Sequence, residues 1–167
     1  MIFIILGSQK FQFNRLLKEV DVLIEEGVIS EEVFAQSGYS DYTPKNYKYE
    51  KFLDRENFNS IIDKSNVVIT HGGTGAIVNS IKKKKKVIGV PRLAKYGEHV
   101  DNHQLEIIEM FKEANLIYGI NQCEELKKAL EEIKIKDFEE YKSNTENIIA
   151  CIEDFILADS NLMGKRR

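Results

Sequence analysis

The residues that point most directly to chemistry are the five at 71–75, which read His-Gly-Gly-Thr-Gly. A run of β-branched residues, 67–70, leads into them, and helix-compatible sequence follows from Ala76. A strand that turns through glycines into a helix aims several free N–H groups at one point. The helix dipole adds about half a positive charge there. The sequence therefore predicts an anion site, best suited to a phosphate or diphosphate.

The residue types within this turn fit close contact with such an anion. Gly72, Gly73 and Gly75 let the backbone approach a ligand without interference from a Cβ atom. Thr74 can either cap the helix or donate its hydroxyl to the ligand. A plain glycine turn between a strand and a helix remains the alternative interpretation.

Two common nucleotide motifs do not fit this turn. A Walker loop needs Gly-Lys-Ser or Gly-Lys-Thr, and neither follows the glycines at 72–75. The dinucleotide fingerprint follows the first strand with different glycine spacing, whereas these glycines follow the fourth expected strand. A nicotinamide-dependent enzyme is therefore disfavoured.

A second dense stretch, 97–104, reads Gly-Glu-His-Val-Asp-Asn-His-Gln. Asp101, Asn102 and Gln104 are types that hold sugar hydroxyls, because their oxygen and nitrogen atoms offer several acceptors or donors. The histidines 99 and 103 stand four apart and would share a face if both lie on a helix. With Glu98 or Asp101 they would then form a zinc site, although a third ligand is not obvious. A polar helix start is the simpler alternative.

Composition sets the class of protein. The chain has 167 residues, 43% hydrophobic and 31% charged, which fits one globular domain with a sizeable core. The net charge of -3 gives no reason to expect nucleic acid. The two cysteines, Cys123 and Cys151, show no metal or redox spacing and fit a reducing cytoplasm. The apolar start, 1–6, is too short for a signal peptide or membrane span, so it is interpreted as a buried strand.

Hydrophobic patterning predicts alternating strands and helices. The expected strands are 2–6, 32–36, 49–53, 67–70, 87–91 and 116–120. The expected helices are 14–26, 54–64, 99–114 and 137–158. A further helix is expected to run from 76 into the lysines at 82–86. Another is expected to begin at a capping box of Asn121 and Glu124 and to continue through 133. Such alternation indicates an α/β fold with a doubly wound parallel sheet, which binds ligands beyond the carboxyl ends of its strands. Loops 7–9, 53–54, 71–75 and 91–104 would then share one rim.

Two further stretches leave alternatives open. The lysines at 82–86 are interpreted as a solvated helix end or as a patch attracted to an anionic membrane. Apolar residues of the last expected helix form a stripe that packs either on its own domain or in a partner's groove; they are Phe138, Tyr141, Ile148, Ile149, Ile152, Phe155 and Ile156. The domain is expected to span 1–160, and the basic tail at 161–167 is expected to be disordered.

Taken together, these stretches resemble the carboxyl-terminal, donor-binding half of the GT-B glycosyltransferases of family 28. The resemblance runs from Met1 to about Ile120 and is most specific at 68–75, at Val-Pro-Arg 90–92 and at 97–104. It is closest to the small separate subunits of two-subunit enzymes. These are the bacterial capsule and exopolysaccharide transferases and the cytosolic subunit of the N-glycan UDP-N-acetylglucosamine transferase. Segments 34–38 and 41–46 look like the bacterial subunits.

The resemblance implies roles by position. Phe52 and Leu53 match the stretch whose backbone reads the uracil, and 71–75 match the diphosphate turn beside Gly7 and Ser8. Gln104, with Asp101 and Asn102, matches the element near the donor sugar. Many relatives hold the ribose with a glutamate in the helix after the turn, where this sequence has Asn79, a weaker and uncharged acceptor.

The resemblance implies an inverting transfer of a sugar from a UDP-sugar to a lipid-linked acceptor, with the leaving UDP stabilised by the helix terminus and no metal expected. His99 and Glu98 are candidates for the general base, unless that group lies on another subunit. The missing half would be a membrane-attached, acceptor-binding subunit that holds this chain at the cytoplasmic face. The last helix, with Ile148, Ile152 and Phe155, is the expected contact. A non-catalytic enhancer of a partner transferase and an epimerase-like fragment are the alternatives.

Overall fold

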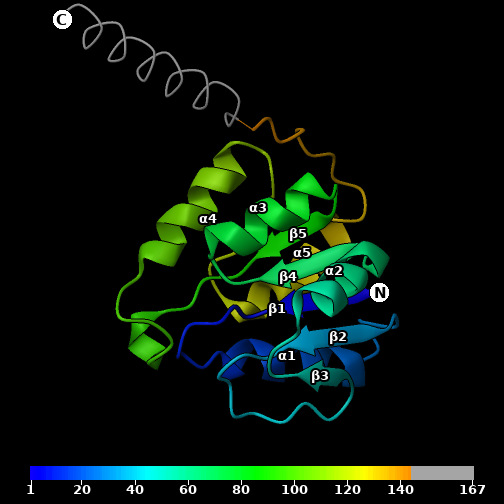
Figure 1. The fold of residues 1–167 in the computed structure, drawn as a ribbon, viewed down its shortest axis with the longest axis vertical. Coiled ribbons are helices and arrows are strands. Elements are labelled where there is room, and N and C mark those ends of the chain that lie inside the picture. The colour runs from blue at the N-terminus through cyan, green and yellow to red at the C-terminus, as the bar shows by residue number, and fades with distance from the viewer. Residues whose placement is uncertain (144–167) are drawn as a thin grey trace, which may run out of the picture.

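The computed structural model describes residues 1–143, which form a sheet of parallel strands with helices on both faces (Figure 1). The strands are β1 Ile2–Ile5, β2 Val33–Gln36, β3 Lys48–Glu50, β4 Val67–Thr70, β5 Lys86–Gly89 and β6 Tyr118–Gly119. The helices are α1 Asn14–Glu25, α2 Arg55–Lys64, α3 Thr74–Lys82, α4 His103–Glu113 and α5 Leu126–Glu132, with 3-10 turns at Ala94–Tyr96 and Cys123–Glu125. The strand order is β3-β2-β1-β4-β5-β6, and every pairing is parallel. The predicted doubly wound α/β fold is confirmed.

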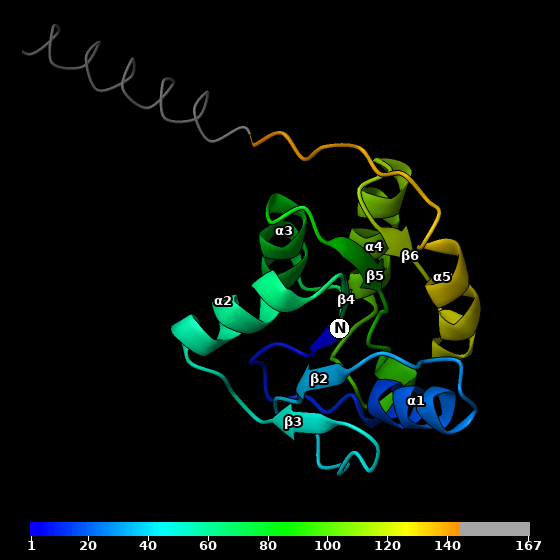
Figure 2. The ribbon, with the colours of Figure 1, turned by 90° about the vertical axis from the view of Figure 1, so that its right-hand side faces the viewer.

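The sheet separates two apolar layers, because successive strand side chains point to opposite faces. Ile2, Ile4 and Leu6 join one layer with α1 and α5, whereas Phe3 and Ile5 join the other with α2, α3 and α4. Figure 2 shows α1 and α5 on one side of the strands and α2 and α3 on the other. All four residues of β1 are buried, as expected for the central strand of a sheet covered on both faces.

The strand order reverses at β1. From β1 the chain proceeds outward to β2 and β3, then returns to add β4, β5 and β6 on the other side of β1. The loops that follow β1 and β4 therefore leave neighbouring strands in opposite directions, and a crevice opens between them. This switch point places Gly7 beside His71, the first residue of the predicted anion turn.

Two predicted boundaries in the first half of the chain, and the predicted capping role of Thr74, are wrong. The strand expected at 49–53 ends at Glu50, so Phe52 and Leu53 lie in the loop before α2. Helix α3 begins at Thr74, two residues earlier than expected, and its N-cap is Gly73 with no side-chain cap. Thr74 is thus the first helical residue and does not cap the helix.

The helix expected at 99–114 begins only at His103. Gly97 adopts a left-handed backbone (φ 66) that ends the preceding 3-10 turn. The Oδ1 atom of Asp101 then accepts the N–H of His103, at 3.0 Å, where α4 starts. His99 therefore lies outside α4 and does not share a helix face with His103. The predicted capping box is also displaced by one residue, since Gln122 and Glu125 form it.

The lysine run is a solvated helix end only in part. Lys82, the last residue of α3, and Lys84 are exposed, whereas Lys86 already belongs to β5. The Lys86 ammonium donates to the carbonyl oxygens of Ile133, Lys134 and Lys136 at 2.8, 2.9 and 3.1 Å. These bonds fix the chain that leaves α5 against the start of β5.

Residues 137–143 are not helical, which contradicts a helix that begins at Asp137. Phe138 packs against one apolar layer and Tyr141 against the other. The rest of that expected helix, with Ile148, Ile149, Ile152, Phe155 and Ile156, lies outside the described residues, as does the tail at 161–167. Within residues 1–143, every helix is too short or too polar to cross a membrane.

Candidate functional site

Three rim loops meet beyond the carboxyl ends of β1, β4 and β5. The loop after β1 spans 7–12, the turn after β4 spans 71–73, and the loop after β5 spans 90–102. Side-chain bonds from Arg92, Gln104 and His99 join these loops to one another. The predicted site segments 7–9, 71–75 and 97–104 therefore come together at one edge of the sheet.

The His71 imidazole lies in the crevice between the β1 loop and the β4 turn. A Cβ added to Gly7 would stand 2.6 Å from its Cε1 atom, and one added to Gly73 would stand 2.4 Å from its Nε2 atom. Real Cβ atoms do not approach other atoms so closely, so both positions must be glycine for the ring to fit. Gly7 also has a left-handed backbone (φ 72), which favours glycine independently.

The protonation state of His71 follows from its surroundings. Its Nδ1 atom lies 3.2 Å from the Ile5 carbonyl oxygen, which only accepts hydrogen bonds. Burial and, to a smaller extent, the charge of the Arg92 guanidinium lower the pKa of His71 to about 4. At neutral pH the ring is therefore neutral with its proton on Nδ1, and Nε2 is an acceptor.

Each glycine of the turn meets different surroundings. A Cβ on Gly72 would lie 2.6 Å from the Cβ of Gln104, so Gly72 is required for the turn to approach α4. A Cβ on Gly75 would have no described atom within 4 Å. Packing among the described residues therefore explains why glycine is needed at 72 and 73, but not at 75. Close approach of a ligand to Gly75 stays a prediction.

The start of α3 has the form of an anion site. Thr74 and Gly75 are exposed in its first turn, where N–H groups have no intrahelical acceptor. The nine residues of α3 point their positive dipole end at this exposed turn. A phosphate placed there would meet donors from the backbone and a partial positive charge.

Gln104 holds the turn to the β5 loop. Its Oε1 atom accepts the N–H of Gly72 at 3.2 Å and the N–H of Arg92 at 3.1 Å. The side chain is buried, at 5% exposure. Its oxygen is therefore occupied by the protein, and only its Nε2 donor stays available for the expected contact with a donor sugar.

Glu98 has a structural role that excludes it as the general base in this conformation. Its carboxylate is 1% exposed and binds the Nε and Nη2 atoms of Arg15 at 3.1 Å each. It also accepts the N–H of Leu93 at 3.0 Å. These bonds close the loop 92–98 against α1 and hold the carboxylate in a buried position that an acceptor hydroxyl does not reach.

His99 is the better placed of the two candidate bases. Its Nδ1 atom lies 3.0 Å from Oδ1 of Asp101, and its Nε2 atom lies 3.3 Å from Oε1 of Gln9. The pKa of Asp101 is lowered, chiefly by the N–H of His103 and also by the bond to His99. Asp101 therefore stays ionised at neutral pH and orients the imidazole toward the loop after β1.

The remaining predicted contact residues lie on the loops of this rim and, for Asn79, within α3. Phe52 is exposed and packs edge-on against Tyr39, with ring centroids 5.2 Å apart. The N–H of Leu53 already donates to the Gln36 side chain at 3.3 Å, so uracil would have to displace that bond to use this donor. Asn79 is half-buried on α3, and the Asn102 Oδ1 atom accepts the N–H of Ala94 at 3.0 Å.

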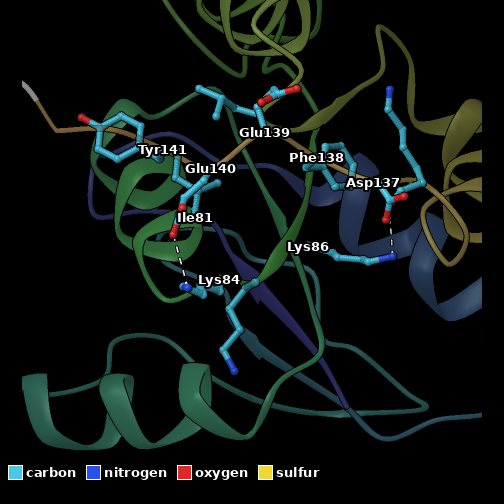
Figure 3. Close-up of a pocket in the computed structure, with 11 residues that line it drawn as sticks. Ile81, Lys84, Lys86, Asp137, Phe138, Glu139, Glu140 and Tyr141 are labelled. Atoms are coloured by element: carbon cyan, nitrogen blue, oxygen red, sulfur yellow. Dashed lines mark hydrogen bonds and ion pairs between the residues drawn. The ribbon is translucent and has the colours of Figure 1, made fainter.

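A different hollow, of about 340 Å³, lies near the start of β5 and is lined by residues of the segment 136–141 (Figure 3). It opens at the amino end of the sheet, away from the rim on which ligands of parallel sheets bind. Its lysines are engaged: Lys84 pairs with Glu140 at 3.2 Å, and Lys86 binds carbonyl oxygens. We therefore assign the functional site to the opposite rim.

The described residues 1–143 contain no group of three or more His, Cys, Asp or Glu side chains arranged to hold a metal. The zinc alternative also loses its geometric basis, because His99 and His103 do not lie on one helix.

Arg92 was not among the predicted site residues, although it belongs to the Val-Pro-Arg segment at 90–92 that carries part of the family resemblance. The guanidinium is fully buried and binds the carbonyl oxygens of Leu6 and Phe11. An arginine just after a buried parallel strand was a usable signal, because such a position lies at the rim that carries ligands.

Comparison with known proteins identifies the family. Residues 1–156 match the model of the glycosyltransferase family 28 C-terminal domain. The chain belongs to this family.

Two curated relatives have the same description, UDP-N-acetylglucosamine transferase subunit ALG13. The relative from Candida glabrata is 35% identical over 96 residues, which cover 56% of this chain and 46% of the relative. The relative from Candida albicans is 32% identical over 76 residues, which cover 44% of this chain and 25% of the relative. The matched regions thus cover less than half of either relative.

Solved glycosyltransferases share the fold. The kitacinnamycin glycotransferase matches with a TM-score of 0.58, covering 81% of this chain and 35% of that chain. Acinetobacter baumannii MurG matches with a TM-score of 0.52, covering 78% and 39%. Sequence identity is 14% in both cases, so these matches support the fold alone. They confirm the predicted Rossmann-like half of a GT-B glycosyltransferase.

Proposed function

We propose that this chain is the donor-binding, catalytic part of a two-subunit inverting glycosyltransferase that uses a UDP-sugar. The observation that carries the proposal is the exposed start of α3 at the switch point of the sheet, next to the glycine-enclosed His71. Family membership gives the class of reaction, and the exposed start of α3 supports the proposal that the diphosphate of the donor binds there.

The chemical role of this site follows from charge. When the sugar leaves, the terminal phosphate of UDP gains negative charge. The fixed N–H groups at the start of α3 would then bind the transition state more strongly than the ground state, which lowers the barrier. Thr74 would add its hydroxyl from the same turn.

The relatives guide the choice of donor. Both curated relatives are described as subunits of a UDP-N-acetylglucosamine transferase, so we make UDP-N-acetylglucosamine the first donor to test. The capsule or exopolysaccharide pathway has no support from these relatives. A lipid-linked acceptor remains part of the proposal.

The rest of the active site is assigned to a partner. We propose that a membrane-attached subunit brings the acceptor to the rim and holds this chain at the cytoplasmic face of the membrane. His99, oriented by Asp101, is our candidate for the base that deprotonates the acceptor hydroxyl. A base on the partner subunit is the alternative.

Binding of UDP to the isolated chain tests the proposal. Isothermal titration calorimetry at pH 7 should give a dissociation constant below about 1 mM for UDP. UMP should bind at least about tenfold more weakly, because it lacks the second phosphate for the start of α3. Absence of heat with UDP would contradict the proposal and favour the non-catalytic enhancer.

A further prediction concerns Gln104. We expect Gln104→Ala to lower the affinity for UDP about threefold to tenfold, because the N–H groups of Gly72 and Arg92 lose their acceptor. Binding of UDP-N-acetylglucosamine should fall at least about tenfold further, because the Nε2 donor of Gln104 is assigned to the sugar. Calorimetry with both ligands measures the two losses.

Gln122→Ala is the matched control for this measurement. It removes a glutamine from the capping box at the 3-10 turn after β6, so it should lower thermal stability without changing either affinity. Equal losses for UDP and the UDP-sugar in Gln104→Ala would remove Gln104 from sugar recognition.

A further inference from the structure

Arg92 is a buried cation whose bonding is incomplete. Its side chain is 0% exposed, yet only its Nη2 atom makes hydrogen bonds. The Nε and Nη1 atoms are buried and have no partner among the described residues. A buried charge without full pairing costs stability, so its presence calls for an explanation beyond packing.

The two bonds of Arg92 shape the loop after β1. Its Nη2 atom donates to the carbonyl oxygen of Leu6 at 2.6 Å and to that of Phe11 at 3.2 Å. These carbonyls flank the segment 7–10, which contains Gly7 and Ser8. One planar guanidinium thus fixes both ends of a rim loop that belongs to a different strand.

The backbone of Arg92 is tied to the anion turn as well. Gln104 accepts the N–H groups of Arg92 and Gly72 on one oxygen atom. Arg92 therefore links the loop after β1, the turn after β4 and the start of α4. A change in its position would reach all three.

The charge of Arg92 acts on the same site. Burial lowers the pKa of Arg92 to about 10, so the guanidinium remains protonated at neutral pH. The acid that interacts with it, Glu98, makes its hydrogen bonds to Arg15 and Leu93 instead. The positive charge is therefore not neutralised by a direct partner, and it helps to keep His71 neutral.

We propose that Arg92 is a positioning residue of the donor site, which fixes the loop that presents Ser8 and supplies a buried positive charge behind the diphosphate turn. The identity of the anion, a diphosphate, rests on the proposed function. A diphosphate bound at the start of α3 would feel this charge without touching the guanidinium, and burial would reduce the screening of the charge by salt.

The groups that face His71 come from three elements around it. Ile5 and Thr70 approach from β1 and β4, and Arg92 and His99 act from the loop after β5. None of these four is an acid, so loss of the Arg92 charge should not be compensated locally.

Two variants separate charge from geometry. Arg92→Gln keeps a donor but removes the charge, and Arg92→Lys keeps the charge but cannot reproduce the planar fork. Titration of His71 by ¹⁵N NMR should show its pKa raised by at least about half a unit in Arg92→Gln and unchanged in Arg92→Lys. Both variants should lower the affinity for UDP at least about fivefold, and Arg92→Gln should bind UDP more weakly than Arg92→Lys.

Lys95→Met is the control, since it removes an exposed positive charge three residues along the same loop. It should leave the His71 titration and the UDP affinity within about twofold of wild type. A purely packing role for Arg92 would lower the melting temperature but leave the His71 titration unchanged in the folded variant.

The outcomes distinguish this proposal from the function itself. Folded Arg92→Gln with unchanged His71 titration and unchanged UDP affinity would overturn the role of Arg92, and failure of both variants to fold would also count against it. If the wild-type chain does not bind UDP, the proposed function fails. The His71 titration would still decide whether Arg92 controls the charge state of the turn.

Discussion

Replacing Gly73 with alanine will weaken UDP binding at least about tenfold, or about 1.4 kcal/mol, in a protein that still folds. The backbone of Gly73 has φ -83 and ψ 113, which alanine adopts without strain. Its Cβ, however, would lie 2.4 Å from Nε2 of His71. The imidazole has to leave its place between Gly7 and Gly73, and the start of α3 moves with it. The expected loss of UDP binding therefore comes from a steric conflict with His71.

Calorimetry with UDP and a thermal melt measure this effect. Gly119→Ala is the matched control, because its Cβ would crowd Ile108 Cγ2 at 2.8 Å at the far edge of the sheet. It should lose a similar amount of stability and keep its UDP affinity. In a His71→Ala background the added cost of Gly73→Ala should shrink to about twofold or less, since the clashing ring is gone. An unchanged cost in that background would show that the conflict lies elsewhere.

The second large effect concerns the partner. The isolated chain should bind UDP yet transfer sugar at least about a thousandfold more slowly than the chain combined with the membrane-attached partner that we propose. The described residues form a single α/β unit, and the matched part covers only 35% to 39% of two solved glycosyltransferases. A GT-B active site is a cleft between two such units, so we propose that the surface which positions the acceptor comes from the partner.

Turnover of radiolabelled UDP-N-acetylglucosamine tests this, with the purified chain alone and with membranes of the source organism. We expect EDTA to leave the partnered rate unchanged, because the start of α3 is assigned the role of stabilising the leaving UDP. A rate of about 1 per second or faster for the isolated chain on a lipid-linked acceptor would contradict the two-subunit proposal.

The fold was predictable because it rests on local patterns. Buried strands such as Ile2–Ile5 and Val67–Thr70 are continuous apolar or β-branched runs, and α1 shows helical spacing of its apolar residues. Boundaries that depend on tertiary contacts were not predictable. The late start of α4 depends on the left-handed Gly97 and on the carboxylate of Asp101, which a periodicity argument does not weigh.

The candidate site was predictable in its parts but not in its bonding. The position of 71–75 at the rim followed from the order of strands and helices, whereas the hydrogen-bond partners of individual side-chain atoms did not. Glu98 looked like a base, but its oxygens bind Arg15 and Leu93, which come from separate parts of the fold. Arg92 was overlooked because its partners, the carbonyls of Leu6 and Phe11, are 86 and 81 positions away in the sequence.

The most direct test of the account is a titration of ¹⁵N-labelled chain with UDP, followed by NMR. The account predicts that the largest shifts of backbone amides fall at Gly7 and Ser8, at Leu53 and at Gly73 to Gly75, around the carboxyl ends of the strands. Shifts confined to the hollow lined by Lys84 and Phe138, at the opposite end of the sheet, would contradict the assignment of the donor site.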